Sequence, residues 1–252
     1  MYDFQKANMW KRISAALCDL IALAIVIVGI AFLLSMVLGY DGYFDRFQEI
    51  SDSYAAEYNV DFDITAEEYE ALSDEDLARY EEASQAFTVD SEANYNYTMI
   101  VNLTFLIITF SVLIGYLLLE FIVPLLFGNG QTLGKKVFGV AVMRADGVKI
   151  SPVLLFARTV LGKYAVETML PVFIIIMIGL KMMGIIGTAV VIGMLVLQLV
   201  LLITTKAKTP VHDLLAHTVC VDFASQMIFE TPEAMLEYKK RIHAEKVEAE
   251  KN

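Results

Sequence analysis

The chain has 252 residues, of which 57% are hydrophobic, and a formal net charge of −11. Soluble domains usually contain about 45–50% apolar residues, so the composition predicts a multi-pass helical membrane protein. Its apolar runs lack the period-two alternation that marks a transmembrane β-barrel. The acidic charge is concentrated in residues 41–96, where seventeen Asp and Glu accompany two Arg. Such an acidic region would repel phosphates, which excludes nucleic acid as an expected partner.

Residues 13–38 form the first apolar run, and Asp19 is the only charged residue in it. A helix of this length is sufficient to cross the hydrocarbon core of a bilayer. A carboxylate near the centre of such a helix costs about 2.5–3.5 kcal/mol on insertion scales, so we expect Asp19 to have a partner or a function. Arg12 precedes it by two helical turns.

Residues 41–96 are predicted to fold as a small acidic cap of helices. Thr65 and Glu68 have the spacing of a capping box, and Ser73 begins a looser version of the same signal. Aromatic and aliphatic residues at helical spacing indicate an amphipathic helix that continues from the first span. They are Tyr43, Phe47, Ile50, Tyr54 and Tyr58.

Three further spans are predicted downstream of this insert. The second covers about residues 98–123. The region 165–204 is roughly twice as long as one span requires, and Lys181 and Gly184 interrupt it. We therefore expect a hairpin of two helices, at about residues 165–181 and 184–204.

Short elements are predicted between the second and third spans. Thr132 can begin a short basic helix. Residues 140–144 and 148–150 flank the turn signal Ala145-Asp146-Gly147, which predicts a β-hairpin. Residues 218–222, after the last span, also have strand composition and could pair with residues 140–144.

Residues 152–164 are predicted to form a separate amphipathic helix. Ser151 and Pro152 have the pattern of an N-cap followed by proline at the first helical position. With Arg158 and Lys163 the segment is too short and too charged to span a bilayer. We expect it to lie in the cytoplasmic interface.

Two helices are predicted after the fourth span. Thr209-Pro210 would open a short helix over residues 210–216. Thr231-Pro232 would open a charged tail helix that reaches about residue 250.

The predicted fold class is an all-α integral membrane protein with four transmembrane helices and a cytoplasmic elbow of short amphipathic helices and a small β-hairpin. An extracytoplasmic acidic helical insert interrupts it. One membrane domain, residues 1–252, would carry the insert at 41–96 and a charged cytoplasmic tail helix at 231–252.

Lysine and arginine in the short loops predict the orientation. They precede the first span, fill the connection between the second and third, and follow the fourth. We expect a cell-membrane protein with both termini in the cytoplasm and the insert outside. The basic residues concerned are Lys6, Lys11, Arg12, Lys135, Lys136, Arg144, Lys149, Arg158, Lys163, Lys206 and Lys208.

The sequence offers little for covalent or metal chemistry. Cys18 lies in the first span and Cys220 follows the last, so no disulfide framework is predicted. His212 and His217 are five residues apart and do not share a helical face, so we expect no metal site. The chain shows no nucleophile–base pair or phosphate-binding loop, and we expect neither enzymatic activity nor a cofactor.

Three segments stand out in chain order, residues 10–19 (WKRISAALCD), 130–140 (GQTLGKKVFGV) and 209–221 (TPVHDLLAHTVCV). With Arg144-Ala145-Asp146-Gly147 and Arg158-Thr159, they resemble the signature of the RDD membrane family, which is named for one arginine and two aspartates. On this match Arg12 and Asp19 correspond to the first two of these residues and Asp213 to the third. The resemblance implies a role in transport, with cation–proton exchange in some members. The acidic insert departs from the family pattern.

We hypothesise that Arg12, Asp19 and Asp213 form a polar cluster that opens to the cytoplasm, supported by Arg158 and His212. In this hypothesis Asp19 exchanges a cation or proton, since an apolar environment raises the pKa of a carboxyl group. The expected partners are the lipid bilayer and a small ion or solute, and the sequence sets no oligomeric state.

The alternative is that Asp19 is a structural ion pair with Arg12, Arg158 or Lys163. The protein would then be a non-transporting membrane scaffold or a partner-binding protein.

Three other acids also have simple structural explanations. Asp213 would either favour the first turn of its short helix through the helix dipole or pair with an arginine such as Arg158. Glu120 and Glu167 lie near predicted span ends, and we expect them to be solvated at the cytoplasmic interface.

Overall fold

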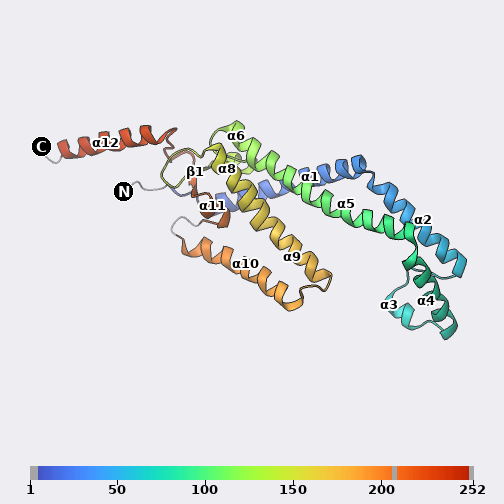
Figure 1. Ribbon diagram of the computed structural model, residues 1–252. Helices are drawn as coiled ribbons and strands as arrows, with labels where there is room; N and C mark the ends of the chain where they lie inside the picture. Colours follow the sequence, from blue (N-terminus) through green and yellow to red (C-terminus); the bar gives the residue numbers. More distant parts are fainter. Residues whose placement is uncertain (1–4, 206–208, 250–252) are drawn as a thin grey trace. The chain divides into compact units, whose positions relative to one another are not determined.

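The computed structural model describes residues 5–205 and 209–249 (Figure 1). Lys206 and Lys208, which contribute to the predicted orientation, lie outside the described residues, as does the end of the predicted tail helix beyond residue 249. The chain divides into two compact units. The first contains Met1–Ile27 and Val112–Asn252, and the second contains Val28–Ser111.

Four helical stretches of the described chain are long and apolar enough to cross a membrane, as the sequence predicts. The second and third contain π-helical segments. The stretches are α1 (Met9–Leu38); α5, η1 and α6 (Ser91–Tyr116, Leu117–Ile122 and Val123–Phe127); α8, η2 and α9 (Pro152–Phe156, Ala157–Met169 and Leu170–Gly179); and α10 (Gly184–Thr204).

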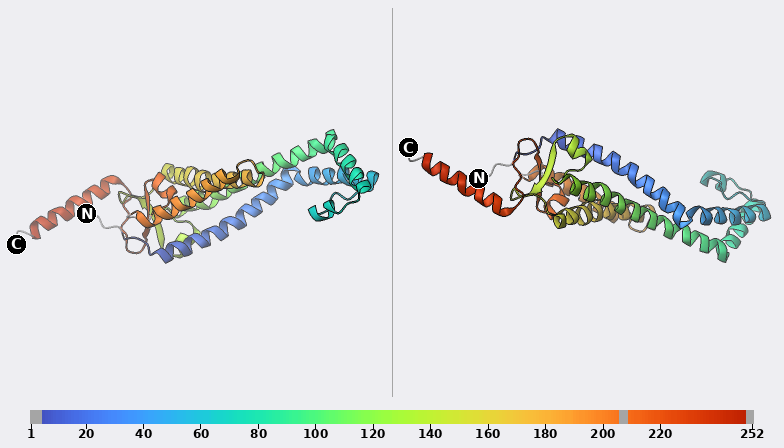
Figure 2. Two further views of the ribbon diagram at one scale, coloured as in Figure 1. Left: turned by 90° about the horizontal axis from the view of Figure 1, so that it is seen from below. Right: turned by 90° about the horizontal axis from the view of Figure 1, so that it is seen from above.

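The last two stretches form the predicted hairpin. α9 ends at Gly179 and α10 begins at Gly184, and positive φ angles at Lys181 and Gly184 make the turn between them. The helices approach closely, because a Cβ on Gly187 would lie 2.8 Å from Ile178 Cγ1. α9 and α10 pack against each other, and the left view of Figure 2 shows α10, in orange, running along α9.

The second unit contains the predicted insert helices. The second and third of them are opened by the expected caps. The Thr65 hydroxyl accepts from the Glu68 amide at 3.2 Å while the Glu68 carboxylate accepts from the Thr65 amide at 2.8 Å, and the Ser73 hydroxyl accepts from the Asp76 amide at 3.2 Å. Gly39, with φ 67°, separates α1 from the first of them. The helices are α2 (Tyr40–Tyr58), α3 (Ala66–Glu70) and α4 (Asp74–Val89).

Aromatic rings form the interior of this unit. The Phe87 ring on α4 lies 5.4 Å from that of Phe47 on α2 and 5.7 Å from that of Phe62 in the following loop, centroid to centroid. Tyr54 on α2 contacts the same ring at 5.8 Å. The helical spacing of aromatics on α2 therefore serves packing within the insert, where each such pair adds about 0.5–1.5 kcal/mol beyond burial.

The sheet of the first unit joins segments distant in sequence. β1 (Val140–Arg144) pairs antiparallel with β2 (Thr218–Asp222), with Val142 opposite Cys220. The predicted hairpin arm at residues 148–150 is reduced to one bridge, between Met143 and Lys149. Five-residue β2 offers β1 a full ladder and a buried apolar surface, and the three-residue arm cannot match either.

Residues 152–164 do not form the separate interfacial helix that the sequence predicts. α8, η2 and α9 run on without a break from Pro152 to Gly179. The prediction was wrong because it assumed that Arg158 and Lys163 are solvated. Arg158 is 1% exposed, and each of the two pairs with an acidic side chain. The start is as predicted, with Ser151 accepting from the Leu154 amide at 3.3 Å.

Three short or terminal helices complete the first unit. The Thr132 hydroxyl caps α7, as predicted. Pro210, in extended conformation, occupies the N-cap position of α11, and Thr209 instead bonds to Thr205. Thr231 accepts from the Ala234 amide at 3.2 Å at the start of α12. Their bounds are α7 (Leu133–Val137), α11 (Val211–Leu215) and α12 (Pro232–Ala249).

α7 lies directly on the backbone of α1. A Cβ on Gly134 would stand 2.2 Å from the Ala15 carbonyl oxygen and 3.0 Å from Cys18 Cβ, both far inside contact distance. Only glycine fits at this position without moving one helix away from the other. Gly134 thus fixes the distance between α7 and α1.

We predict that Gly134→Ala lowers stability by about 1–3 kcal/mol, because the added methyl collides with backbone and not with a movable side chain. Gly193→Ala on α10 is the matched control, since among the described residues no atom beyond its chain neighbours and the nearby backbone of its own helix lies within 4 Å of the added methyl. It should be neutral or raise stability by up to about 1 kcal/mol. Thermal unfolding in detergent measures both, and equal midpoints would contradict the close approach.

Candidate functional site

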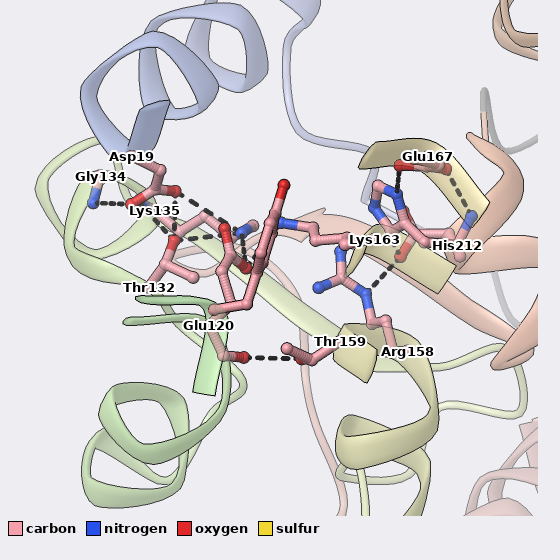
Figure 3. Close-up of polar contacts among 12 residues, drawn as sticks. Asp19, Glu120, Thr132, Gly134, Lys135, Arg158, Thr159, Lys163, Glu167 and His212 are labelled. Carbon is pink, nitrogen blue, oxygen red and sulfur yellow. Dashed lines mark hydrogen bonds and ion pairs between the residues drawn. The ribbon is translucent and has the colours of Figure 1, made fainter. Parts of the chain in front are cut away.

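The first unit contains a partly open cavity of about 500 Å³. Its walls come from α1, the end of α5, η1, α7, η2, α10, α11 and the sheet. Four basic and four acidic side chains border it together with His212, so the formal charges cancel when the histidine is neutral. The charged residues are Arg12, Lys135, Arg158, Lys163, Asp19, Glu120, Glu167 and Asp213. Figure 3 shows how most of these side chains converge.

Asp19 is bound by the first turn of α7. Its Oδ1 accepts from the Gly134 amide at 2.7 Å, and its Oδ2 accepts from the Thr132 hydroxyl (Figure 3). The Lys135 ammonium lies 3.7 Å from Oδ2, and 11% of the Asp19 side chain is exposed. These contacts explain how the apolar first span accommodates a carboxylate, because its hydrogen-bonding groups are satisfied inside the protein.

Lys135 lies between two acids. Its Nζ is 3.7 Å from the Asp19 carboxylate and 3.9 Å from that of Glu120, and it donates to Thr132 Oγ1 at 3.1 Å. Its side chain is 10% exposed. The sequence placed Lys135 among the basic loop residues that mark the cytoplasmic side, so its role as the cation beside Asp19 was missed.

Glu120 is a second buried acid, which the sequence analysis wrongly expected to be solvated. Its side chain is 6% exposed and lies 2.6 Å from Lys163 Nζ. The Thr159 hydroxyl donates to its backbone carbonyl at 2.9 Å, which ties η1 to η2. One available signal was its position, seven residues before the end of an apolar helix at Phe127 and not at the end itself.

Arg158 and Asp213 form an ion pair with 1% and 0% of their side chains exposed. Arg158 Nε donates to Asp213 Oδ1 at 2.7 Å, and the Thr218 hydroxyl donates to the same oxygen at 2.8 Å. Burial opposes ionisation of Asp213, but the neighbouring Arg158, His212 and Thr218 outweigh it and hold its pKa well below the usual range. Asp213 lies in the first turn of α11 and also pairs with Arg158, so the structure has the geometry of both interpretations offered for this residue.

His212 is bonded through both its ring and its backbone to Glu167. Nδ1 lies 2.7 Å from Glu167 Oε2, and the His212 amide donates to Oε1 at 2.8 Å. Burial lowers the pKa of His212 despite the nearby Asp213 carboxylate, 3.7 Å from Nε2. Glu167, also expected to be solvated, instead joins η2 to α11.

The predicted trio of Arg12, Asp19 and Asp213 borders this one cavity. Arg158 pairs with Asp213, as one interpretation expected, whereas Lys135 was not among the cations expected beside Asp19, and Lys163 pairs with Glu120. Arg12 is half-buried in the cavity wall. Within the described residues, no group of three or more His, Cys, Asp or Glu could hold a metal ion.

Four apolar helices around a charge-lined cavity define a multi-pass helical membrane protein. Residues 6–217 match the family model described as RDD family, so the chain belongs to the RDD family. A comparison with curated proteins found no match, and neither did a comparison with solved structures.

We predict that Asp213→Asn destabilises the protein by about 3–5 kcal/mol, because it leaves the Arg158 charge buried without a counter-ion. Glu230→Gln is the control: it breaks the pair with Lys149, in which Glu230 is 73% exposed, and should cost less than about 1 kcal/mol. The double replacement Arg158→Met with Asp213→Leu should recover part of the loss. Thermal unfolding in detergent separates these outcomes, and equal effects of the two single variants would refute the assignment.

Proposed function

We propose that the protein is a non-enzymatic transporter of the cell membrane that moves a small ion or solute through the charge-lined cavity. The observation that carries this proposal is the cavity itself, with eight charged side chains drawn from distant segments around about 500 Å³. Ionisable residues in membrane segments are costly and usually mark ion or substrate pathways. The volume also falls within the range of about 300–1,000 Å³ that is usual for small-ligand sites.

Asp19 is the residue that we propose exchanges a cation or proton. It borders the cavity, and its Oδ2 faces both the Thr132 hydroxyl and the Lys135 ammonium. A carboxylate that contacts a hydroxyl, an amide and a cation can exchange one of these partners for a ligand, and the remaining partners still stabilise its negative charge. Arg158 and Asp213, by contrast, form a fully buried ion pair, so we assign them a structural role in the cavity wall.

Asp19→Asn should reduce cation-coupled proton flux to background in proteoliposomes, because the amide retains the size of the carboxylate but cannot carry its charge. The measurement is the pH change inside vesicles on addition of Na⁺, K⁺ or Ca²⁺. Glu230→Gln, which removes an exposed carboxylate outside the cavity, should leave the flux unchanged. Flux through Asp19→Asn equal to the unsubstituted protein would remove Asp19 from the mechanism.

The rival function is a non-transporting membrane scaffold, and one observation favours it. Both oxygens of Asp19 already have hydrogen-bond donors on α7, so the residue has a sufficient structural role in holding α7 to α1. A scaffold predicts no flux in the unsubstituted protein and a lowered melting temperature for Asp19→Asn. The flux assay and thermal unfolding, run on the same preparations, therefore discriminate the two functions.

We further propose that both termini are cytoplasmic and the acidic insert is outside. Lys135, Arg158 and Lys163 are buried in ion pairs, so the loop-charge argument rests on the remaining basic residues. The bias of basic residues toward the proposed cytoplasmic side remains in Lys11, Lys136 and Lys149.

Cysteine labelling tests this orientation in intact cells. A membrane-impermeant maleimide should modify Asp63→Cys in the insert from outside, and Glu230→Cys only after permeabilisation, since both positions are exposed. The protein with only its own Cys18 and Cys220 gives the background. Labelling of Glu230→Cys in sealed cells would reverse the proposed orientation.

A further inference from the structure

The Lys135 ammonium is buried but has few hydrogen-bond partners. Its side chain is 10% exposed, and among the described residues its Nζ makes one hydrogen bond, to Thr132 at 3.1 Å. The carboxylates of Asp19 and Glu120 lie at 3.7 and 3.9 Å, beyond hydrogen-bonding distance. An ammonium has three donors, so this cation is attracted to its surroundings without being tightly bound by them.

Three oxygens from three separate elements surround this position. They belong to Asp19 on α1, Glu120 on η1 and Thr132 at the start of α7. The Glu120 oxygen is shared, because it also pairs with Lys163 Nζ at 2.6 Å. Three acceptors match the three N–H donors of a primary ammonium. Hard cations such as Ca²⁺ take six to eight oxygen ligands, which is more than this set of residues supplies.

The charge of the cavity fits a single positive charge at this point. With Lys135 in place, the four bases and four acids of the wall balance. If the Lys135 side chain swings away, the wall is left with a net charge of −1. A monovalent cation restores the balance, whereas a divalent ion would exceed it.

The adjoining space suits an organic group. The cavity volume of about 500 Å³ is far more than one inorganic ion fills, and apolar side chains line it beside the charges. Leu20 and Leu23 of α1, Tyr116 of α5 and Leu202 of α10 are among them. An alkyl chain attached to the ammonium would be buried against these residues.

We propose that the cavity binds a small primary alkylammonium compound, whose ammonium replaces that of Lys135 between Asp19, Glu120 and Thr132. Lys135 is then an internal occupant of the site, which neutralises it when the ligand is absent. The flexible four-carbon stem allows the displaced ammonium to move away. The proposal rests on the proposed function in that it uses the same cavity, and it specifies the class of ligand.

The first test supplies an alkylammonium from solution to the variant Lys135→Ala, which lacks the lysine ammonium. We expect n-propylammonium chloride to raise the melting temperature of this variant by roughly 3–6 °C at a concentration about ten times the dissociation constant. NaCl and tetramethylammonium chloride at equal ionic strength should not, because neither offers N–H donors. The double variant Lys135→Ala with Asp19→Asn should lose the response. An equal response to all three salts would overturn the proposal.

The second test uses the unsubstituted protein, so that the proposal does not depend on the variant folding. n-Propylammonium should stabilise it more than tetramethylammonium does, with a half-saturating concentration about tenfold or more above that of Lys135→Ala, because the tethered ammonium competes. Lys136→Ala, which removes a neighbouring exposed lysine that lies over the Phe127 ring at 3.7 Å, should behave like the unsubstituted protein. If n-propylammonium stabilises Lys135→Ala but stabilises the unsubstituted protein no more than tetramethylammonium does, Lys135 is a fixed structural residue. That result would overturn the proposal.

Failure here and failure of transport have different signatures. Selective binding of n-propylammonium without flux in proteoliposomes supports the site and contradicts transport. Cation-coupled flux that depends on Asp19, without selective binding of n-propylammonium, supports transport and contradicts this ligand class.

Discussion

The Asp19 carboxylate accepts hydrogen bonds from the Thr132 hydroxyl and the Gly134 amide, and these bonds hold α7 against α1. An acid in an apolar span has to be compensated inside the protein, and the first turn of α7 does this with a hydroxyl, an amide and a nearby ammonium. Since Lys135 belongs to the same five-residue helix, the contact that satisfies Asp19 also brings a cation to the cavity. The bonds to Asp19 therefore position the part of the cavity wall that α7 forms.

The remaining charges of the cavity are compensated by the same logic across longer distances in sequence. Glu120 pairs with Lys163 and Arg158 with Asp213, and the Glu167 carboxylate is hydrogen-bonded to His212. None of these pairs is local, so each one forms only when its two elements pack together. Removing one partner leaves a buried charge, which is costlier than removing both. The π-helical segments η1 and η2 carry four of these six residues, in keeping with the frequent occurrence of π-helical turns at functional sites.

Predictions from local signals agreed best with the structure. The caps at Thr65, Ser73 and Thr132 each involve residues three positions apart, and the four spans follow from long apolar runs. The sequence does not show whether a charged side chain faces solvent or a distant partner in the fold. For this reason the predictions for Glu120 and Glu167 were wrong. The segment 152–164 was misassigned for the same reason, because counting charges in a window cannot reveal that each charge has an opposite charge elsewhere in the chain.

The sequence by itself determined the class of membrane protein, the number of spans, the acidic insert and the family, because apolar length, charge distribution and motif order are properties of the linear chain. Tertiary structure alone decided which cation lies beside Asp19, that Glu120 is buried, and that the charged residues border a common cavity. The physical reason is that the energy of a buried charge depends on its neighbours within a few ångströms, and these neighbours come from segments far apart in the sequence, as with Asp19 and Lys135.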